Sequence, residues 1–540
     1  MSITNWNNYF PYPKYRDQQK SAIDKILSEF KNGKKYAIVE CGTGVGKSAI
    51  GLTVARTINN SSEYEGIYTN GSYFLTTQKI LQNQYEKDFS KFDLVSLYSS
   101  SNYMCKIDKK QTCKDIQTSL RNSNIDKKFD KCKYDCCYKN AKKDFIEKDL
   151  GITNFSYFLT EKNYSGKLPH KKILVIDEAH NLENELSRFI EISISSYFSE
   201  KILNKKIPDD ITTQFKMFKW IKDIYLKSLN SKIDFMKSQL QKLGLTGNKL
   251  EEFKKISNNY DMLVSHSKKI LEFITIYDKE NWIFDIEETE SKKYKKFVFK
   301  PIDVSHYSKQ YLLDFADYII FMSATIISHE GFMETIGLDS EKTISIKESS
   351  PFDPKNSPVI YSPAGKMSAK TIDKTLPVMV DMIKAILSNH KDKKGIIHTH
   401  NTKIAKHICN TIRDSRLILA YGENRNKNLE KHIKSKKATV LISPSMAEGV
   451  DLKGNLSDFQ IICKIPFPYL GDKVTRKKMN KWSWWYNTQT VRTIIQSLGR
   501  SIRSENDKAV TYILDGDWER IKSNCKDYFP ENFFKNYHEY

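Results

Sequence analysis

The chain has 540 residues, which at a prior of roughly 150 residues per domain corresponds to three or four domains. Hydrophobic residues make up 39% of the chain and charged residues 28%, a composition that excludes wholesale disorder and an integral membrane protein. The 87 lysines and arginines exceed the 65 acidic residues and give a net charge of +22. This excess favours a polyanionic partner such as nucleic acid, although a lysine-rich surface also serves solubility alone.

No stretch approaches the ~18 consecutive apolar residues of a membrane-spanning helix. The strongest apolar run, Tyr318 to Met322, has the length of a strand. The first residues lack the basic head and apolar stretch of a secretory signal. We therefore expect a cytoplasmic protein with no membrane partner.

The first motif in chain order predicts a phosphate-binding loop. Residues 36–40 predict a strand and residues 49–57 a helix, with a glycine-rich turn ending in Lys-Ser between them. Small residues let backbone N–H groups close around phosphates, and the helix N-terminus adds its positive end. Cys41 stands where the strict pattern has glycine. The residues expected to bind ATP and magnesium here are Gly42, Thr43, Gly44, Gly46, Lys47 and Ser48.

A second motif predicts the acidic half of the same site. Residues 173–176 are apolar and predict a buried parallel strand, at whose carboxyl end doubly wound sheets bind ligands. Asp177 follows directly and is expected to hold magnesium through water, while Glu178 polarises the attacking water. Two acids after a strand are weak evidence alone, but together with the phosphate loop they predict an ATP hydrolase.

The spacing of these motifs leaves room for two insertions. A strand from Tyr73 ends in the polar residues Thr76, Thr77 and Gln78, and the core pattern resumes only near Gly151. Residues 100–148 therefore predict one insertion. Residues 195–297 are lysine-rich and mostly helical in period, and predict a second one without a catalytic signal of its own.

Cysteine usage predicts a metal site in the first insertion. Of nine cysteines, five lie between Cys105 and Cys137. An odd total in a long chain without a secretory signal does not resemble a disulfide framework. The spacing alone leaves open whether the metal is zinc or an iron–sulfur cluster.

The second half predicts another α/β domain after Ser349 to Phe352. Residues 395–399 and 438–443 predict buried strands, and no second phosphate loop follows, so this half is expected to complete the site of the first. Arg500 and Arg503, three residues apart, are expected on one helix face.

Some side chains have a structural and a functional interpretation. Trp482, Trp484 and Trp485 fit a packed helix face better than a base-stacking platform. His398 and His400 could line a cleft, but structural histidines are the favoured interpretation.

Taken together, the motifs resemble those of superfamily 2 helicases, specifically the XPD/DinG family of iron–sulfur DNA helicases. The matching segments, in order, are Phe10 to Gln19, the phosphate loop, Thr76 to Gln78, Asp177 to His180, Ser323 to Thr325, Glu448 to Asp451 and Gln496 to Arg503. The resemblance implies that Gln19 reads adenine and that Thr76, Thr77 and Gln78 contact nucleic-acid phosphates. It also implies that Asp451 belongs to the nucleotide site, that Gln496 helps to close the cleft, and that Arg500 and Arg503 neutralise charge in the transition state.

The resemblance further implies a 4Fe–4S cluster in the first insertion and an arch domain in the second. The segment from Cys136 to Lys142 resembles the family's Cys-Pro-Tyr-x-x-Ala-Arg ending, which places Cys137 in the proline slot. The implied ligands are Cys105, Cys113, Cys132 and Cys136. A structural zinc site with four cysteines stays open as the alternative.

The implied fold class is α/β, with two RecA-like P-loop NTPase domains and both insertions in the first. The expected segments are a first motor domain (1–99, 149–194 and 298–345), the cluster insertion (100–148), the arch (195–297) and a second motor domain (346–540). The implied function is that of a monomeric ATP- and magnesium-dependent DNA helicase, moving 5′ to 3′ on single-stranded DNA and acting at single/double-strand junctions in repair or replication. Such a protein is expected at the nucleoid or in a nucleus. The alternatives are a DNA-dependent ATPase that remodels protein–DNA complexes without strand separation, and a non-enzymatic DNA-binding scaffold, against which Lys47 and Glu178 argue.

Overall fold

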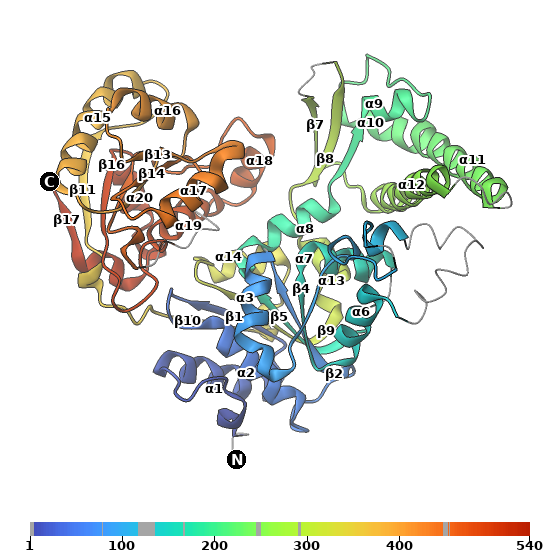
Figure 1. Ribbon diagram of the computed structural model, residues 1–540, viewed down its shortest axis with the longest axis horizontal. Coiled ribbons are helices and arrows are strands. Elements are labelled where there is room, and N and C mark those ends of the chain that lie inside the picture. The colour runs from blue at the N-terminus through green and yellow to red at the C-terminus, as the bar shows by residue number, and fades with distance from the viewer. Residues whose placement is uncertain are drawn as a thin grey trace.

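The computed structural model describes residues 5–77, 79–107, 109–116, 135–165, 168–244, 250–289, 293–445, 452 and 454–540. Two seven-stranded sheets lie in the two segments expected to be motor domains, and a three-stranded sheet lies in the segment expected to be the arch, so these names denote the three parts. In Figure 1 the second motor domain (orange to red) and the arch (green) both stand above the first motor domain (blue). Two parallel sheets of this kind confirm the predicted α/β class.

The first sheet has the order β10-β1-β9-β5-β2-β4-β3, and all its strand pairs are parallel. Its central strands are fully buried, as near-continuous apolar runs require. The strands are β1 (Tyr36–Cys41), β2 (Thr69–Thr76), β3 (Val95–Leu97), β4 (Leu150–Asn154), β5 (Lys171–Asp177), β9 (Ala316–Ser323) and β10 (Thr343–Glu348). Because β1, β9 and β5 are neighbours, their carboxyl ends bring three predicted motifs to one edge.

Alternating side chains of these strands pack against helices on both faces of the sheet. Val39 belongs to the core that α1 and α2 cover, whereas Ile38 belongs to the core on the opposite face. That second core continues through α7 and α8 into the arch, which fastens the arch to the first motor domain. The helices are α1 (Asp17–Lys31), α2 (Lys47–Asn59), α3 (Lys79–Phe89), α6 (Cys137–Glu147), α7 (Phe155–Thr160), α8 (Leu182–Ile190), α13 (Ser305–Tyr311) and α14 (His329–Ile336).

The arch contains a sheet that its helical periodicity did not predict. Strands β6, β8 and β7 pair in antiparallel fashion and extend beyond the expected range 195–297 at both ends. Its elements are β6 (Ile192–Ser195), α9 (Ser196–Lys201), α10 (Gln214–Trp220), α11 (Leu226–Gly244), α12 (Leu250–Ile276), β7 (Trp282–Glu288) and β8 (Lys295–Pro301). The long antiparallel pair α11 and α12 projects away from the motor domains in Figure 1.

The second sheet has the order β13-β14-β12-β15-β16-β11-β17 and is also parallel throughout. Since β10 pairs with β1, the chain crosses to this domain after Glu348, slightly later than the expected boundary. The elements are β11 (Val359–Gly365), α15 (Ile372–Asn389), β12 (Gly395–His398), α16 (Thr402–Thr411), β13 (Leu417–Leu419), α17 (Arg425–Lys434), β14 (Val440–Ser443), β15 (Phe459–Ile462), α18 (Lys473–Lys481), α19 (Trp485–Leu498), β16 (Val510–Asp515), α20 (Trp518–Asn524) and β17 (Tyr537–Glu539). None of the helices in the described part of the chain is long and apolar enough to span a bilayer.

Candidate active site

The phosphate loop joins β1 to α2 and depends on two left-handed glycines. Gly44 has a φ of +86° and Gly46 a φ of +88°, values at which a side chain would be strained. The Nζ of Lys47 lies 3.4 Å from the carbonyl oxygen of Cys41, so the ammonium group folds back over the loop. The turn thus has the shape that the glycine pattern predicted.

The acidic residues lie beside the loop at the end of β5. Asp177 is buried, and its Oδ2 accepts a 2.9 Å hydrogen bond from the hydroxyl of Tyr85. The same hydroxyl also lies within hydrogen-bonding reach of Ser48. Burial and the neighbouring Glu178 raise the pKa of Asp177 to about 6, and the Lys47 ammonium partly opposes this rise. Tyr85, which sequence reasoning missed, therefore orients both predicted magnesium ligands.

Glu178 has a left-handed backbone with a φ of +53°. Such a conformation is unfavourable for a residue with a side chain and is typical of functional sites. The side chain of Glu178 is one-third exposed and reaches to 3.3 Å from Nδ1 of His180. It lines the cleft between the motor domains, where an attacking water would lie.

His180 connects the two motor domains through a defined hydrogen-bond chain. The side-chain amide of Gln496 donates to Nε2 of His180 at 2.9 Å and lies 3.2 Å from the Thr325 hydroxyl. Because Nε2 accepts, the neutral imidazole carries its proton on Nδ1, which donates to the Ser323 hydroxyl at 2.7 Å. Burial, with Arg492 and Arg500 nearby, lowers the pKa of His180 well below its ordinary value and keeps it neutral.

The segment after Ser323 is held from both sides. Arg492 on α19 donates from Nε to the carbonyl oxygen of Thr325 at 3.0 Å. Glu40, buried at the end of β1, accepts the backbone N–H of Ile327 at 2.9 Å. The carboxylate of Glu40 also meets His329, and the pKa of Glu40 is lowered, although burial opposes the ionised form. Sequence reasoning missed Glu40 and Arg492, since neither belongs to a recognisable local pattern.

A cleft of about 1200 Å³ separates the motor domains and gathers most predicted catalytic residues. Its lining includes Lys47, Glu178, Gln496, Arg500 and Arg503. The expectation that both arginines share a helix face is wrong, because α19 ends at Leu498. Asp507 accepts the backbone N–H groups of Arg503 and Ser504, both at 2.7 Å, and this local bonding replaces a further helical turn.

Two further residues were predicted to bind the nucleotide, Gln19 and Asp451. The amide of Gln19 accepts from the backbone N–H of Arg16 at 2.9 Å and donates to the carbonyl oxygen of Gly46 at 3.4 Å. Adenine reading by Gln19 stays a prediction. Asp451 lies outside the described residues.

The segment that crosses to the second domain also touches the phosphate loop. The Ser350 hydroxyl donates to the carbonyl oxygen of Thr43 at 2.9 Å. A side chain at Gly44 would lie 2.0 Å from the Phe352 ring, and one at Gly42 would meet the Ser350 backbone at 2.6 Å. These glycines therefore permit a close approach that the sequence pattern did not reveal.

The three residues at the end of β2 that were predicted to contact nucleic acid differ in their surroundings. Thr76 is fully buried, Thr77 lines the cleft, and Gln78 lies outside the described residues. A DNA contact in this segment stays a prediction.

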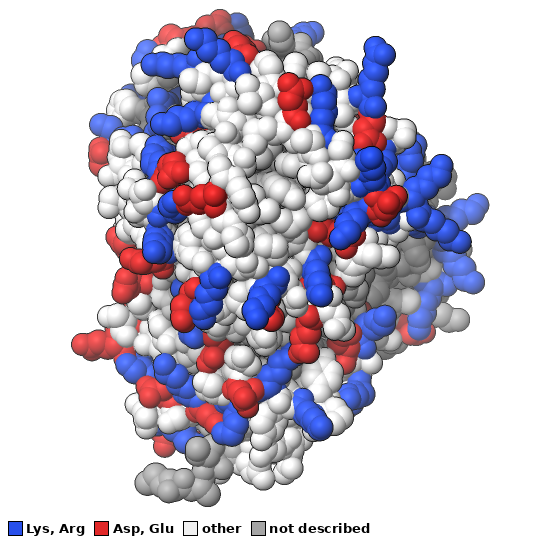
Figure 2. Space-filling view, turned by 90° about the vertical axis from the view of Figure 1, so that its left-hand side faces the viewer, with Lys and Arg blue, Asp and Glu red and all other residues white. Residues whose placement is uncertain are grey.

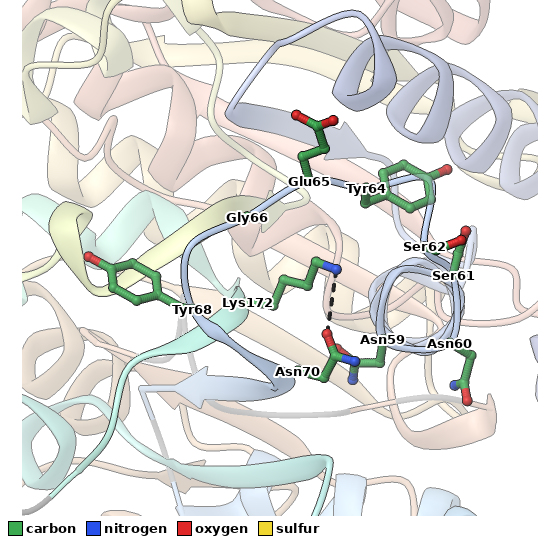
Figure 3. A pocket seen from close by; sticks show the side chains of 10 residues that line it. All are labelled: Asn59, Asn60, Ser61, Ser62, Tyr64, Glu65, Gly66, Tyr68, Asn70 and Lys172. Carbon is green, nitrogen blue, oxygen red and sulfur yellow. Dashed lines mark hydrogen bonds between the residues drawn. The ribbon is translucent and has the colours of Figure 1, made fainter.

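A separate polar pocket of about 680 Å³ lies around residues 59–70, with Lys172 reaching Asn70 at 3.4 Å (Figure 3).

Comparison with known proteins agrees with this geometry. Residues 383–536 match the family model described as a helicase C-terminal domain, and residues 12–207 match the one described as the res subunit of type III restriction enzymes. A probable ATP-dependent helicase of Methanocaldococcus jannaschii is 23% identical over 97% of this chain and 95% of its own. The ATP-dependent DNA helicase XPD of Sulfolobus acidocaldarius is 23% identical over 95% of this chain and 98% of its own.

Solved structures agree at the level of the fold. An XPD helicase structure aligns with a TM-score of 0.65 at 18% identity, covering 98% of this chain and all of its own. The Xpd4 structure of S. tokodaii aligns with a TM-score of 0.60 at 14% identity, covering 97% of this chain and all of its own. Along nearly its whole length the chain resembles the XPD/DinG-like helicases of superfamily 2. Its two parallel sheets have the RecA-like fold of the XPD structures.

The cysteine insertion of this XPD/DinG-like chain places two sulfurs together. Cys113 and Cys136 are buried with their sulfurs 3.9 Å apart, and burial together with Cys136 raises the pKa of Cys113 to about 11. Cys105 is buried and Cys137 is half-buried, while Cys132 lies outside the described residues. Within the described part of the chain, no three potential metal ligands converge. Buried, closely spaced thiols fit a thiolate-bound metal in kind, and a bound metal would keep them deprotonated.

We expect Gln496→Leu to lower the turnover number of ATP hydrolysis on the order of 10- to 100-fold, because His180 and Thr325 lose a buried hydrogen-bond donor. Nucleotide affinity should change little, since the hydrogen bonds of the Gln496 amide go to His180 and Thr325. Steady-state hydrolysis and equilibrium nucleotide binding measure the two quantities. Thr493→Val is the matched control, because that hydroxyl bonds only within α19. A wild-type turnover number in Gln496→Leu would refute the role of this contact.

We expect Cys105→Ser and Cys136→Ser to lose bound metal, whereas the half-buried Cys137→Ser retains it. Metal analysis and visible absorption of anaerobically purified protein measure both the content and the kind of metal, because an iron–sulfur cluster absorbs visible light and zinc does not. Loss of metal from Cys137→Ser together with retention in Cys136→Ser would contradict the ligand assignment.

Proposed function

We propose that this chain is an ATP-dependent DNA helicase that couples hydrolysis to movement along single-stranded DNA and to duplex separation. The observation that best supports this proposal is a single cleft. The expected phosphate-binding and acidic groups lie on one wall, and Gln496, Arg500 and Arg503 lie on the other. Such a site can be complete only when the motor domains close, so hydrolysis is tied to domain movement. The relatives named as ATP-dependent DNA helicases support DNA as the substrate.

On the first wall, Lys47 would neutralise the terminal phosphates while the loop N–H groups hold them. Ser48 and Asp177 would hold magnesium, with Tyr85 orienting both side chains. Magnesium held there would neutralise negative charge on the phosphates. Glu178 would orient the attacking water from its strained position beside His180. Because His180 is neutral, it adds no second positive charge beside Lys47. Its ring lies next to Glu178 and accepts the hydrogen bond from Gln496, so it connects Glu178 to the opposite wall.

On the second wall, Arg500 and Arg503 would stabilise the negative charge that spreads over the transferred phosphoryl group. Their position in a loop, rather than on a helix, allows them to approach the phosphates as the cleft closes. Arg492 and Gln496 hold the Thr325 segment meanwhile, so the rearrangement reaches the first domain.

The DNA path is proposed on broader grounds. The net charge of +22 favours binding to a polyanion. Figure 2 shows lysines and arginines interspersed with acidic side chains on the face it presents, so the positive charge there forms no single continuous field. Movement from 5′ to 3′, action at strand junctions, a monomeric state, and work at the nucleoid or in a nucleus belong to the same proposal. A 4Fe–4S cluster, held by Cys105, Cys113, Cys132 and Cys136, would serve as a structural clamp of the first insertion.

We expect Lys47→Ala and Glu178→Gln both to abolish ATP turnover and duplex unwinding, but for different reasons. Loss of Lys47 removes a phosphate contact and should weaken nucleotide binding. Loss of the Glu178 carboxylate removes only the group that orients the attacking water, so nucleotide should stay bound but not be hydrolysed. Equilibrium nucleotide binding, hydrolysis and strand separation on a duplex with a single-stranded tail distinguish these outcomes.

The matched control is Glu185→Gln, which removes a nearby carboxylate that pairs with Arg188 at 3.2 Å. It should behave as wild type. Full hydrolysis in Glu178→Gln would contradict the assignment. Wild-type protein that hydrolyses ATP on DNA without separating strands would replace the proposal with that of a remodelling ATPase.

A further inference from the structure

The helix α8 is the direct covalent link between the nucleotide site and the arch. It begins at Leu182, two residues after His180, and ends at Ile190, next to the arch strand β6 that begins at Ile192. Leu182, Leu186 and Ile190 anchor one side of this helix in the core. Any displacement of its first turn is therefore passed along a rigid element to the arch.

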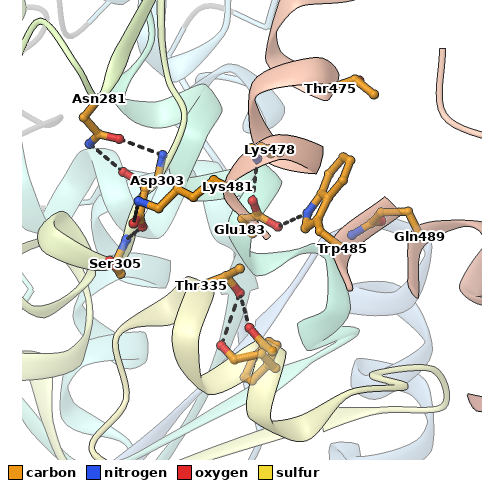
Figure 4. A network of polar contacts seen from close by, with 12 residues as sticks. Glu183, Asn281, Asp303, Ser305, Thr335, Thr475, Lys478, Lys481, Trp485 and Gln489 are labelled. Carbon is orange, nitrogen blue, oxygen red and sulfur yellow. Dashed lines mark hydrogen bonds and ion pairs between the residues drawn. The ribbon is translucent and has the colours of Figure 1, made fainter. Parts of the chain in front are cut away.

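The first turn of α8 is held by the second motor domain at Glu183. The carboxylate of Glu183 accepts hydrogen bonds from Nζ of Lys478 on α18 and, at 3.4 Å, from Nε1 of Trp485 on α19 (Figure 4). The side chain of Lys478 is 4% exposed and that of Glu183 is 12% exposed. This ion pair is buried between two domains and belongs to none of the sequence motifs.

The same part of the second domain makes further contacts with carboxylates around α8. Lys473 lies 2.7 Å from Asp285 on the arch strand β7, and Lys481 pairs with Asp303 next to β8. Trp482 donates to Glu334 on α14 at 2.8 Å. The tryptophan side chains thus lie at an interdomain contact in this structure, whereas the favoured interpretation of the sequence was a packed helix face.

The helix α19 also carries Gln496, which bonds to His180 about three turns beyond Trp485. One helix of the second domain therefore contacts α8 at Glu183 and the catalytic segment at His180. A buried ion pair cannot be partly opened without leaving a charge in a poorly hydrated site, so its contact favours two discrete arrangements. When the cleft opens or closes, both contacts must move together or separate.

We propose that Glu183 is a positioning residue through which Lys478 and Trp485 transmit movement of the second motor domain to the arch. The proposal rests on the proposed function, because it assigns to α8 the transfer of ATP-driven motion to the part of the molecule that acts on DNA. Glu183 touches no substrate. It acts by fixing the orientation of α8 relative to α18 and α19.

The test compares ATP hydrolysis with strand separation in Lys478→Met, which removes the buried cation but keeps most of the side-chain volume. We expect DNA-stimulated hydrolysis to stay within about twofold of wild type while the unwinding rate falls on the order of tenfold. Lys477→Met, an exposed neighbour on α18, is the matched control and should change neither quantity. Melting temperatures show whether each variant is folded.

A charge exchange provides the second test. Glu183→Lys combined with Lys478→Glu restores the ion pair with its two charges exchanged between the domains. This double variant should recover part of the unwinding that is lost in Lys478→Met. Normal unwinding per ATP in Lys478→Met, or an equal loss of hydrolysis and unwinding, would overturn the proposal. A lack of recovery in the exchanged pair would also overturn it. If wild-type protein hydrolyses ATP without unwinding at all, the proposed function itself fails, and that result is distinct from a failure confined to Lys478.

Discussion

The hydrogen bond from Gln496 to His180 joins the two motor domains directly beside the predicted catalytic acids. It joins α19 of the second motor domain to the segment that follows Asp177 of the first. The bond requires a neutral imidazole with its proton on Nδ1, and the low pKa of His180 keeps the ring neutral. The Ser323 hydroxyl then accepts a hydrogen bond from Nδ1–H, so three segments that are distant in sequence share one chain of hydrogen bonds.

Buried polar groups of this kind restrict the number of arrangements that the cleft can adopt. Glu40, Asp177 and His180 are each removed from water and hydrogen-bonded. Each would leave an unsatisfied buried group if its partner moved away. Motion of one domain relative to the other therefore exchanges a whole set of contacts. The Lys478 pair with Glu183 extends this principle away from the nucleotide, towards the arch.

Much of the nucleotide site was predictable from sequence, because its signals are local. Glycines at left-handed positions, Lys47 before a helix, and Asp177 after an apolar strand each follow from a few neighbouring residues. The parallel class of both sheets was predictable for the same reason, since buried strands alternate with helices. The cysteine pair Cys113 and Cys136 was predictable as a cluster, although not as a geometry.

The rest arises from contacts between distant segments. Tyr85 lies on α3, which follows β2, and it reaches Asp177 because β2 and β5 are neighbours in the sheet. Phe352 lies close to the phosphate loop because the crossover segment passes over that loop. The arch sheet escaped prediction because β6 is separated from β7 and β8 by the helices α9 to α12. The helical placement of Arg500 and Arg503 failed because Asp507, beyond the motif, accepts backbone groups that a helix would have used.

The central claim is that one ATP site is shared by both motor domains, and Arg500 tests it most directly. Arg500→Ala should keep nucleotide affinity close to wild type while hydrolysis falls by up to ~10³-fold, since an arginine of this kind acts on the transition state. The measurement is single-turnover hydrolysis with saturating nucleotide, with the exposed Arg413→Ala of the same domain as control. Unchanged single-turnover hydrolysis in Arg500→Ala would contradict the account, because the first domain would then hydrolyse ATP without the second.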